Sequence, residues 1–291
     1  MAKINQNKIS IILPARNEAS SLEILLPKLK SLYPDAQIIV VDDKSEDSTE
    51  AVCQKYNVDR ITNKRHLGNG GSIKAGTRKA RGQRLVFMDA DGQHNPEDIP
   101  KLIAKLNEGF DMAVGARSKN SQASLGRLLA NTIYNRLSSW IVNSRILDLT
   151  SGFRAVDAEK FRQFLYLLPN GFSYPTTITM SFFRAGYALA YVPIKVKKRL
   201  GKSHIRLLHD GARFFIIIFK VGTLYSPLKI FIPISAFHFV IGISYYAYTY
   251  TIYQRFTNMS ALLFIASILI FLIGLVSEQI TTLLFKDSGD E

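Results

Sequence analysis

The fold is decided first by the stretch Leu85–His94, whose sequence is LVFMDADGQH. Its first four residues form a short apolar run, which predicts a buried strand of an α/β sheet. If the chain stays extended beyond Met88, the side chains of Asp89, Asp91 and Gln93 share one face, because side chains alternate along a strand. Two carboxylates and an amide oxygen then meet at the carboxyl end of a strand, where open α/β sheets bind ligands.

Oxygen ligands of this kind suit a hard cation such as Mg²⁺ or Mn²⁺, which would also be held by the phosphates of a ligand. We therefore predict a metal site formed by Asp89, Asp91 and Gln93. The alternative is an acidic turn that caps the next helix, because Asn95–Asp98 (NPED) is a good helix start.

Strand and helix patterns alternate through the first two thirds of the chain. Strands are predicted at 8–13, 37–41, 84–88, 112–115 and 191–196, and helices at 18–32, 47–56, 72–81, 97–107 and 126–142. This alternation predicts an α/β fold with a mostly parallel sheet covered on both faces.

The composition limits the classes of partner. The chain has 291 residues, 47% of them hydrophobic, and a net charge of +14, which favours anionic partners. Its aromatic and basic residues do not interleave as in a nucleic-acid module, so we expect no nucleic-acid partner. The single cysteine, Cys53, excludes an internal disulfide and is expected to be a small buried hydrophobe in a reducing compartment.

The two ends of the chain differ. The N-terminus passes into the first strand without a hydrophobic leader, so we expect no secretory signal. Segments 230–254 and 256–277 contain no Asp, Glu, Lys or Arg, and each exceeds the roughly 20 residues that cross a bilayer. We predict a hairpin of two transmembrane helices, about 230–254 and 257–279, within a segment 230–286 that ends in a short cytoplasmic tail.

Charges and aromatic residues predict how this hairpin sits in a membrane. Tyrosines cluster toward its tip, as in an interfacial aromatic belt, whereas Lys220, Lys229 and Lys286 flank its other end and predict a cytoplasmic catalytic domain. Segment 203–229 is apolar but interrupted by basic residues, which predicts amphipathic helices in the membrane interface. Packing of these helices on the soluble domain is the alternative.

Two further segments carry candidate ligand contacts. Asp42 and Asp43 follow the second predicted strand and could accept hydrogen bonds from a base or a ribose. Ser45 and Asp47 could instead simply cap the following helix. Gly68–Gly71 (GNGG) opens a helix and would allow close approach of an anion, although its spacing is not that of a dinucleotide fingerprint.

Together these segments resemble the family 2 glycosyltransferases, which have the GT-A fold, a Rossmann-like nucleotide-diphospho-sugar transferase domain. The resemblance rests on Pro14 with Asn17-Glu18, on Asp42-Asp43-x-Ser45-x-Asp47-x-Thr49, and on Asp89-x-Asp91-x-Gln93-His94-x-Pro96-Glu97. More narrowly, the chain is similar to the polyprenyl-phosphate glycosyltransferases of the dolichol-phosphate-mannose synthase type, through Gly115-x-Arg117, Asp148-x-Thr150-Ser151-Gly152-Phe153-Arg154 and Arg199-x-Gly201-Lys202-Ser203-His204.

The resemblance covers residues 8 to about 205 and implies a catalytic domain over 1–202, juxtamembrane helices over 203–229 and the hairpin beyond. It implies a membrane-anchored, inverting and metal-dependent transfer of a monosaccharide from a UDP- or GDP-linked sugar to undecaprenyl or dolichyl phosphate. Magnesium or manganese would be the cofactor.

The resemblance also implies roles for individual residues. Those expected at the nucleotide sugar are Pro14, Ala15, Arg16, Glu18, Asp42, Asp43, Gly70, Lys74 and Asp91. Those expected at the acceptor phosphate are Arg117, Arg127, Arg154, Arg199, Lys202 and Ser203, and the catalytic set would be Asp89, Asp91, Arg117, Arg199 and Lys202. Asp89 could be a base or a metal ligand, and Asp148 either a further catalytic candidate or a residue that pins its loop.

A phosphate acceptor fits these residues. A phosphate monoester is mostly dianionic at neutral pH and needs no strong general base. The enzyme must instead bring two anions together, which metal and guanidinium charges allow. For Arg127, Arg154 and Lys202, an ordinary solvated surface charge is the alternative.

Three other functions stay open at this point. A processive polysaccharide synthase would carry a Gln-x-x-Arg-Trp motif, but the single tryptophan, Trp140, follows Ser138-Ser139. A glycosyltransferase for another membrane lipid and a non-catalytic membrane adaptor that retains the fold remain. The sequence leaves the sugar, the base and homo-oligomerisation undetermined.

Overall fold

The computed structural model describes residues 6–117, 125–171, 174–196, 219–220 and 222–285, and only the backbone of residues 7 and 125–131. The chain forms two compact units. The sheet unit comprises residues 1–136 and 144–207, and the hairpin unit comprises residues 137–143 and 208–291. The chain therefore passes between the units three times, and helix α5 (Leu125–Val142) contributes to both.

The sheet unit is built on seven strands in the order β3-β2-β1-β4-β6-β5-β7. They are β1 (Ile9–Ala15), β2 (Gln37–Asp42), β3 (Asp59–Thr62), β4 (Arg84–Phe87), β5 (Met112–Arg117), β6 (Arg154–Asp157) and β7 (Leu189–Ile194). Only β6 runs antiparallel to its neighbours, β4 and β5. The predicted mostly parallel α/β sheet is confirmed, with β3 and β6 added to the predicted strands.

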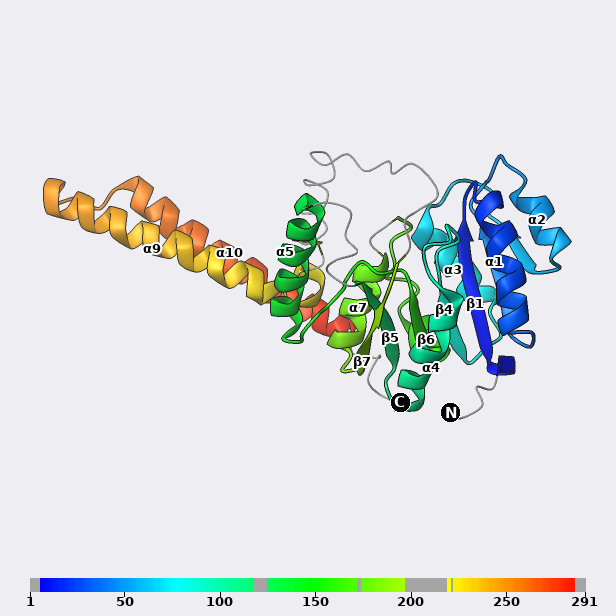
Figure 1. Cartoon of the computed structure of the whole chain (residues 1–291). Coiled ribbons are helices and arrows are strands. Elements are labelled where there is room, and N and C mark those ends of the chain that lie inside the picture. The colour runs from blue at the N-terminus through cyan, green and yellow to red at the C-terminus, as the bar shows by residue number, and fades with distance from the viewer. Residues whose placement is uncertain (1–5, 118–124, 172–173, 197–218, 221, 286–291) are drawn as a thin grey trace. The chain divides into compact units, whose positions relative to one another are not determined.

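Helices cover both faces of this sheet, as Figure 1 shows. Apolar residues of α1 (Ala19–Leu32), α2 (Thr49–Lys55) and α4 (Ile99–Asn107) pack in one cluster with inward residues of β1, β2 and β4. Cys53 is buried in this cluster, which confirms its predicted role. On the other face α3 (Asn69–Lys79) packs so closely that a Cβ at Gly76 would lie 2.5 Å from Ile12.

Two helices of this second face were absent from the predicted set, namely α6 (Ala158–Gln163) and α7 (Tyr174–Arg184). Aromatic side chains join them to the sheet. The ring centroids of Phe161 and Phe87 are 4.7 Å apart, and those of Phe164 and Phe182 are 5.6 Å apart. The second face therefore has an aromatic core, whereas the first is mainly aliphatic.

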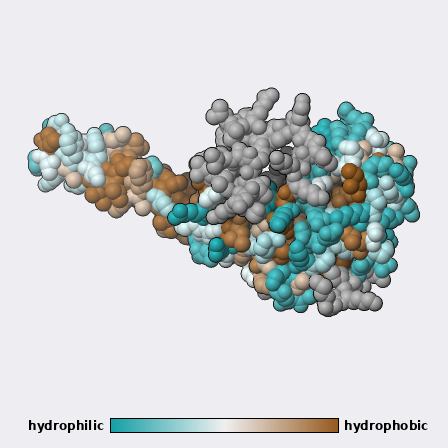
Figure 2. Space-filling model, viewed as in Figure 1, coloured by the Kyte–Doolittle hydropathy of each residue, from teal (hydrophilic) through white to brown (hydrophobic). Residues whose placement is uncertain are grey.

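The hairpin unit contains α9 (Pro227–Tyr253) and α10 (Asn258–Leu284), each 27 residues long. Both are long and apolar enough to cross a membrane, and only 11% and 17% of their most apolar windows are buried. Figure 2 shows hydrophobic side chains over much of the visible hairpin surface. A soluble core helix would bury these side chains, so the helices have the character of a membrane hairpin.

Small residues form the contact between α9 and α10. Ser235 and Ser267 each donate a hydroxyl hydrogen bond to the other's carbonyl oxygen, at 2.9 and 3.0 Å, and a Cβ at Gly274 would lie 2.5 Å from Phe231. Close approach of this kind is how helices associate in lipid, where apolar burial gives little driving force. Most of the predicted juxtamembrane segment 203–229 lies outside the described residues.

Candidate active site

The carboxyl ends of β1, β2 and β4 meet at one edge of the sheet. The three strands are parallel, and Ala15 pairs with Asp42 while Ile12 pairs with Phe87. From β1 the chain continues to β2 on one side, and β4 lies on the other. Open α/β sheets usually bind ligands in a crevice at the carboxyl edge where the strand order reverses in this way, and we use the word crevice for this edge.

The loops that follow β1 and β2 bind each other beside this crevice. The Asn17 amide donates to the Ser45 hydroxyl at 3.0 Å, and Asn17 Oδ1 accepts from the Glu46 amide at 2.8 Å. Asp47 accepts from the Ala19 amide at 3.0 Å, at the start of α1. Asp47 also accepts from the Thr49 amide at the start of the following helix, at 3.0 Å, as the capping alternative predicted. The Ser45 hydroxyl bonds the neighbouring loop instead.

Asp43 is enclosed by the segment 63–68. Its Oδ1 accepts from the Leu67 amide and Asn63 Nδ2, both at 2.8 Å, and its Oδ2 accepts from the Gly68 amide at 2.7 Å and contacts His66 Nδ1 at 2.6 Å. Burial raises the pKa of this carboxyl, but these hydrogen bonds and the charge of His66 outweigh burial, so its pKa lies below the ordinary value. The geometry supports a structural role for Asp43, and its contact with a nucleoside stays a prediction.

Asp42 is also buried. Its Oδ1 accepts from the Ser45 amide at 2.8 Å, and its Oδ2 lies 3.3 Å from Arg60 Nη1. Of the other predicted nucleotide-sugar residues near β1, Arg16 and Glu18 are more open. Arg16 is exposed and contacts His66 Nε2 at 3.1 Å, and Glu18 accepts from the Ser21 hydroxyl at 3.2 Å. Pro14 and Ala15 belong to the end of β1 itself.

The chain turns after β4 instead of staying extended. Strand β4 ends at Phe87, Gly92 has φ +73°, and Asp91 Oδ1 accepts from the Gln93 amide at 3.1 Å. This turn corrects the predicted alternation of Asp89, Asp91 and Gln93 along a strand. The physical reason is the glycine, which adopts a left-handed conformation that permits the turn.

Asp89 sits at the inner end of this turn with 36% of its side chain exposed. His94 Nε2 lies 3.5 Å from its Oδ2, and a Cβ at Gly152 would lie 3.1 Å from the same oxygen. Burial raises the pKa of the Asp89 carboxyl, but hydrogen bonds from His94 and Asn69 and the charges of His94 and Arg117 hold it below the ordinary value. Asp89 is therefore an anion at neutral pH.

His94 is held in place by packing. It is 7% exposed, and its ring stacks on Phe153 with centroids 5.0 Å apart and an angle of 17° between planes. His94, Asn69 and Gly152 all contact Asp89, but none belongs to the predicted site set. His94 and Gly152 stand inside the quoted motifs, so motif membership was the available signal. The contact of Asn69 depends on how α3 is placed and had no signal in the sequence.

Arg117 and Asp148 form a bidentate ion pair. Arg117 Nε lies 2.8 Å from Asp148 Oδ2 and Nη2 lies 2.9 Å from Oδ1, while Nη2 also donates to the Thr150 hydroxyl at 2.6 Å. Burial raises the pKa of Asp148, but Arg117 outweighs it and lowers the pKa. Asp148 thus pins its loop, as the structural alternative predicted, and Arg117 keeps 31% of its side chain exposed.

The start of α3 does not present its amides to the crevice. The Gly70 amide donates to the Gly171 carbonyl at 3.2 Å, and the Gly71 amide donates to the Asn170 carbonyl at 2.9 Å. A Cβ at Gly70 would lie 2.1 Å from Pro169 O, so glycine is needed for this backbone contact. The prediction that Gly70 approaches an anion is therefore corrected, because a neighbouring loop occupies the helix start.

Two basic residues of the predicted site bond to groups of the protein itself. Lys74 donates to the Leu168 carbonyl at 3.0 Å. Arg154 is fully buried, and its guanidinium donates to the Ser151 and Pro175 carbonyls and to the Thr179 hydroxyl. Arg154 therefore ties its strand to α7, and neither the acceptor-phosphate role nor a solvated surface charge describes it. Arg199, Lys202 and Ser203 lie outside the described residues, as does the side chain of Arg127.

The residue types on the turn after β4 are those that a divalent cation prefers. Among the described residues no cluster of three or more His, Cys, Asp or Glu side chains could hold a metal alone. Asp89, Asp91 and Gln93 instead offer two carboxylates and an amide on one tight turn. Mg²⁺ and Mn²⁺ commonly bind through one or two carboxylates and complete their shells with water and ligand phosphates. A side chain at position 152 would crowd the Asp89 carboxylate, because its Cβ would lie 3.1 Å from Oδ2.

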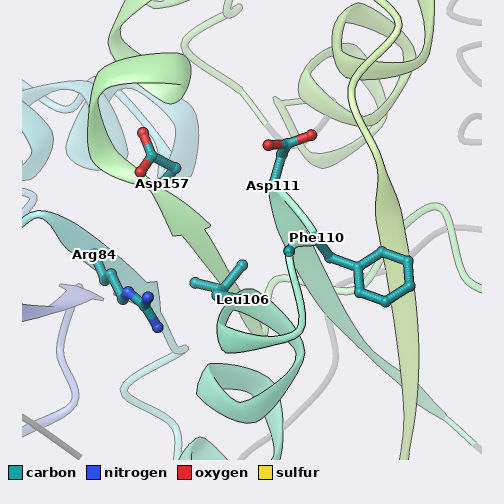
Figure 3. Close-up of a pocket in the computed structure, with 6 residues that line it drawn as sticks. Arg84, Leu106, Phe110, Asp111 and Asp157 are labelled. Carbon is teal, nitrogen blue, oxygen red and sulfur yellow. The ribbon is translucent and has the colours of Figure 1, made fainter.

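A cavity of about 180 Å³ lies at the opposite end of the strands. Arg84, Leu106, Gly109, Phe110, Asp111 and Asp157 line it (Figure 3). Its charges have partners already, because Asp111 pairs with Lys160 and Asp157 accepts from the first amides of α6. It lies where β4 and β5 begin, so it is separate from the carboxylate crevice.

Comparison with known proteins gives relatives in both sequence and structure. The chain is 35% identical over 141 residues to an undecaprenyl-phosphate 4-deoxy-4-formamido-L-arabinose transferase of Proteus mirabilis, covering 45% of this chain and 43% of that protein. It is 28% identical over 215 residues to an undecaprenyl-phosphate mannosyltransferase of Micrococcus luteus, covering 67% of this chain and 86% of that protein. The match thus spans less than half of the Proteus protein.

Among solved structures, the glucosyl-3-phosphoglycerate synthase of Mycobacterium tuberculosis in complex with Mn²⁺, UDP-glucose and phosphoglyceric acid is similar, with a TM-score of 0.61 and 21% identity. The match covers 74% of this chain and 79% of that one. It shows a shared GT-A-like fold. Residues 226–283 match the family model described as a GtrB C-terminal hairpin. Residues 10–165, more than half of the chain, match the model of glycosyl transferase family 2, and the chain belongs to that family.

Proposed function

We propose that this protein transfers a monosaccharide from a nucleotide-diphosphate sugar to a polyprenyl phosphate within a membrane. The observation that carries the proposal is the joining, on one chain, of a family 2 domain and a C-terminal hairpin of membrane character. The undecaprenyl-phosphate specificity in the names of the Proteus and Micrococcus relatives supports the acceptor class.

The hairpin suits a lipid acceptor physically. A long isoprenoid chain partitions into the bilayer, and a domain anchored to the same bilayer meets its phosphate in two dimensions. We place the catalytic domain on the cytoplasmic face, because Lys229 lies at the end of α9 that joins the rest of the chain and positive residues favour that side.

The chemistry follows from the charges at the crevice. An oxygen of the acceptor phosphate attacks the anomeric carbon, and the bond from that carbon to the nucleoside diphosphate breaks, which inverts the configuration. The attacking phosphate is mostly dianionic at neutral pH, so no side chain has to remove a proton from it. Asp89, Asp91 and Gln93 would hold the divalent cation, which when bound neutralises charge on the diphosphate.

The ion pair with Asp148 orients the Arg117 guanidinium. Asp148 fixes both Nε and Nη2 of Arg117, so the guanidinium cannot swing freely, and its charge lowers the pKa of Asp89 nearby. A fixed guanidinium suits a phosphate that must be placed at one angle to the sugar. We therefore keep Arg117 as an acceptor-side residue and treat Asp148 as the residue that positions it.

The acceptor class is tested by a matched pair of lipids. The full-length protein in detergent is given Mn²⁺, a panel of UDP- and GDP-sugars, and either a short polyprenyl phosphate or the corresponding polyprenol. We expect the phosphate to be glycosylated and the alcohol to be left unchanged, because only the phosphate carries its own nucleophilic charge. Transfer to the alcohol, or to diacylglycerol instead of the phosphate, would overturn the proposal.

Binding of the metal and the donor is tested by ligand-dependent stabilisation. We expect Mn²⁺ and the correct nucleotide sugar together to raise the melting temperature, since a ligand that binds only the folded state stabilises it. Chelation of the metal should remove both the stabilisation and the transfer. An unchanged melting temperature with every donor would favour a non-catalytic adaptor.

A further inference from the structure

The last turn of α5 belongs to the hairpin unit, although the rest of that helix belongs to the sheet unit. Residues 137–143 contact the start of α9 through a set of polar interactions. Lys229 Nζ donates to the carbonyls of Trp140 and Ile141, both at 2.9 Å, and to Asn143 Oδ1. The Ser226 hydroxyl also donates to the Ile141 carbonyl at 3.2 Å.

These bonds satisfy the end of a helix. The final carbonyls of an α-helix have no partner within it, and a cation at this position also interacts well with the helix dipole. Apolar packing adds to the contact, since Ile141 is 2% exposed, and a Cβ at Gly222 would lie 3.3 Å from its Cδ1. Hydrogen bonds and apolar packing therefore hold residues 137–143 against the start of α9.

The length of α9 gives the depth of this contact in a bilayer. From Lys229 to Tyr253 the helix rises about 36 Å at 1.5 Å per residue, whereas the hydrocarbon core is about 30 Å thick. Arg255 follows the helix and must stay out of hydrocarbon on the far side. Lys229 then reaches the headgroup layer on the near side, and the Trp140 carbonyl lies within hydrogen-bond distance of its ammonium.

We infer that the last turn of α5, residues 137–143, is a membrane-interface element whose Trp140 side chain lies among the lipid headgroups. The Trp140 side chain is exposed, at 47%, which is costly for so large an apolar group in water but favourable at the interface, where tryptophan is enriched. The inference rests on the membrane-spanning hairpin of the proposed function, but not on the reaction or the acceptor.

The consequence concerns how the catalytic domain is held. Helix α5 continues from residues of the sheet unit, so its last turn would attach the chain to the bilayer at a place in addition to the hairpin itself.

Trp140 is the only tryptophan of the chain, so its own fluorescence reports its depth without labelling. The full-length protein is reconstituted into vesicles of phosphatidylcholine and phosphatidylglycerol that carry a nitroxide either on the headgroup or deep in the acyl chain. We expect loss of Trp140 emission to be greater with the headgroup nitroxide than with the deep one. Aqueous iodide should quench it weakly.

Two relocated tryptophans provide the controls, each combined with Trp140→Phe. Phe237→Trp lies within α9 at a side chain that is 63% exposed, and it should be quenched more by the deep nitroxide. Ile24→Trp lies on α1 at a side chain that is 68% exposed, and it should respond to iodide and to neither nitroxide.

The controls separate two ways of failing. If Trp140 behaves like Ile24→Trp while Phe237→Trp is still quenched by the deep nitroxide, the inference is overturned and the membrane hairpin stands. If Phe237→Trp is not quenched by lipid either, the hairpin does not enter the bilayer, and both the inference and the membrane part of the proposed function fall.

A variant tests the role of Lys229. Lys229→Met removes the donor to the three oxygen atoms at the end of α5, and Lys220→Met is the matched control at an exposed lysine outside this contact. We expect the first variant to lose headgroup quenching of Trp140 and to gain iodide quenching, and the second to keep the wild-type pattern. An unchanged quenching pattern in Lys229→Met would contradict the inference that Lys229 holds the last turn of α5 at the membrane interface.

Discussion

Two aspartates occupy equivalent positions in the fold but differ in their burial and in their hydrogen-bond partners. Asp43 and Asp89 both follow a parallel strand at the carboxyl edge of the sheet. Asp43 is 6% exposed, and its two oxygens contact four donors from residues 63–68. Asp89 is 36% exposed, and His94 Nε2 lies 3.5 Å from its Oδ2. An aspartate at a strand end can therefore be enclosed by internal donors or left partly open, and its position alone does not distinguish the two.

The contacts support a structural role for Asp43, and the Asp89–Gln93 turn is the metal site that we propose. The substitution with the largest expected effect on this contrast is Asp91→Ala. Because Asp91 is one of only two carboxylates at the proposed metal site, its loss should lower kcat/KM by about a thousandfold, the size expected for removing a principal electrostatic contact. The melting temperature should change little, because Asp91 lies on a turn rather than in the core. Near wild-type turnover would contradict the metal role of Asp91 and the contrast between Asp43 and the Asp89–Gln93 turn.

Asp43→Ala should give the reverse result, with stability affected more than binding. It leaves the Leu67 and Gly68 amides and Asn63 Nδ2 without their acceptor, and a buried unsatisfied donor costs about 1–3 kcal/mol. We expect the free energy of unfolding to fall by about 3 kcal/mol in total, measured by urea unfolding of the full-length protein in detergent. A stable Asp43→Ala protein that no longer binds nucleotide would show instead that Asp43 contacts the nucleoside.

Gly152→Ala tests how closely Asp89 must be placed. The new Cβ would lie 3.1 Å from Asp89 Oδ2, so the carboxylate must shift by a few tenths of an ångström. A small misplacement of a catalytic group is costly, and we expect about a tenfold loss of kcat/KM. Gly171→Ala is the matched control, because a Cβ there meets nothing within 4 Å. Equal losses in the two variants would mean that the contact of Gly152 does not position Asp89.

The sequence predicted what depends on local pattern. Apolar runs located β1, β2, β4, β5 and β7 within a few residues, and periodicity located α1 to α5. Two long segments without charged residues located both hairpin helices. Strand β6 was not predicted, since its sequence is only Arg-Ala-Val-Asp and it is stabilised by two neighbours far away in the chain. A short strand with two apolar residues has no distinctive pattern of its own.

The site shows the same limit more sharply. The acidic residues were identified correctly as lying at strand ends, but the geometry of the turn depended on one glycine, Gly92, adopting a positive φ. The glycines at the start of α3 looked suited to an anion, yet they bind the carbonyls of Asn170 and Gly171, about a hundred residues later. The same glycine can serve a ligand or a backbone neighbour, and only tertiary structure distinguishes the two.

The smallest expected effect is the pH dependence of stability that Asp43 contributes. Its pKa in the folded protein is below that of the unfolded chain, which is about 3.9. A carboxyl of this kind stabilises the fold above the unfolded pKa, and the stabilisation is lost as the pH falls through the folded pKa.

Asp43→Asn removes this titration while keeping a side chain of similar shape. Below about pH 4, the gap in unfolding free energy between the wild type and Asp43→Asn should therefore narrow, by about 1.4 kcal/mol for each unit by which the pKa is lowered. Unfolding by urea at a series of pH values measures this gap, and the other carboxyls cancel because both proteins contain them. A gap that stays constant through acid pH would mean that Asp43 is not held as an anion by its four donors, and the contrast with Asp89 would lose its electrostatic basis.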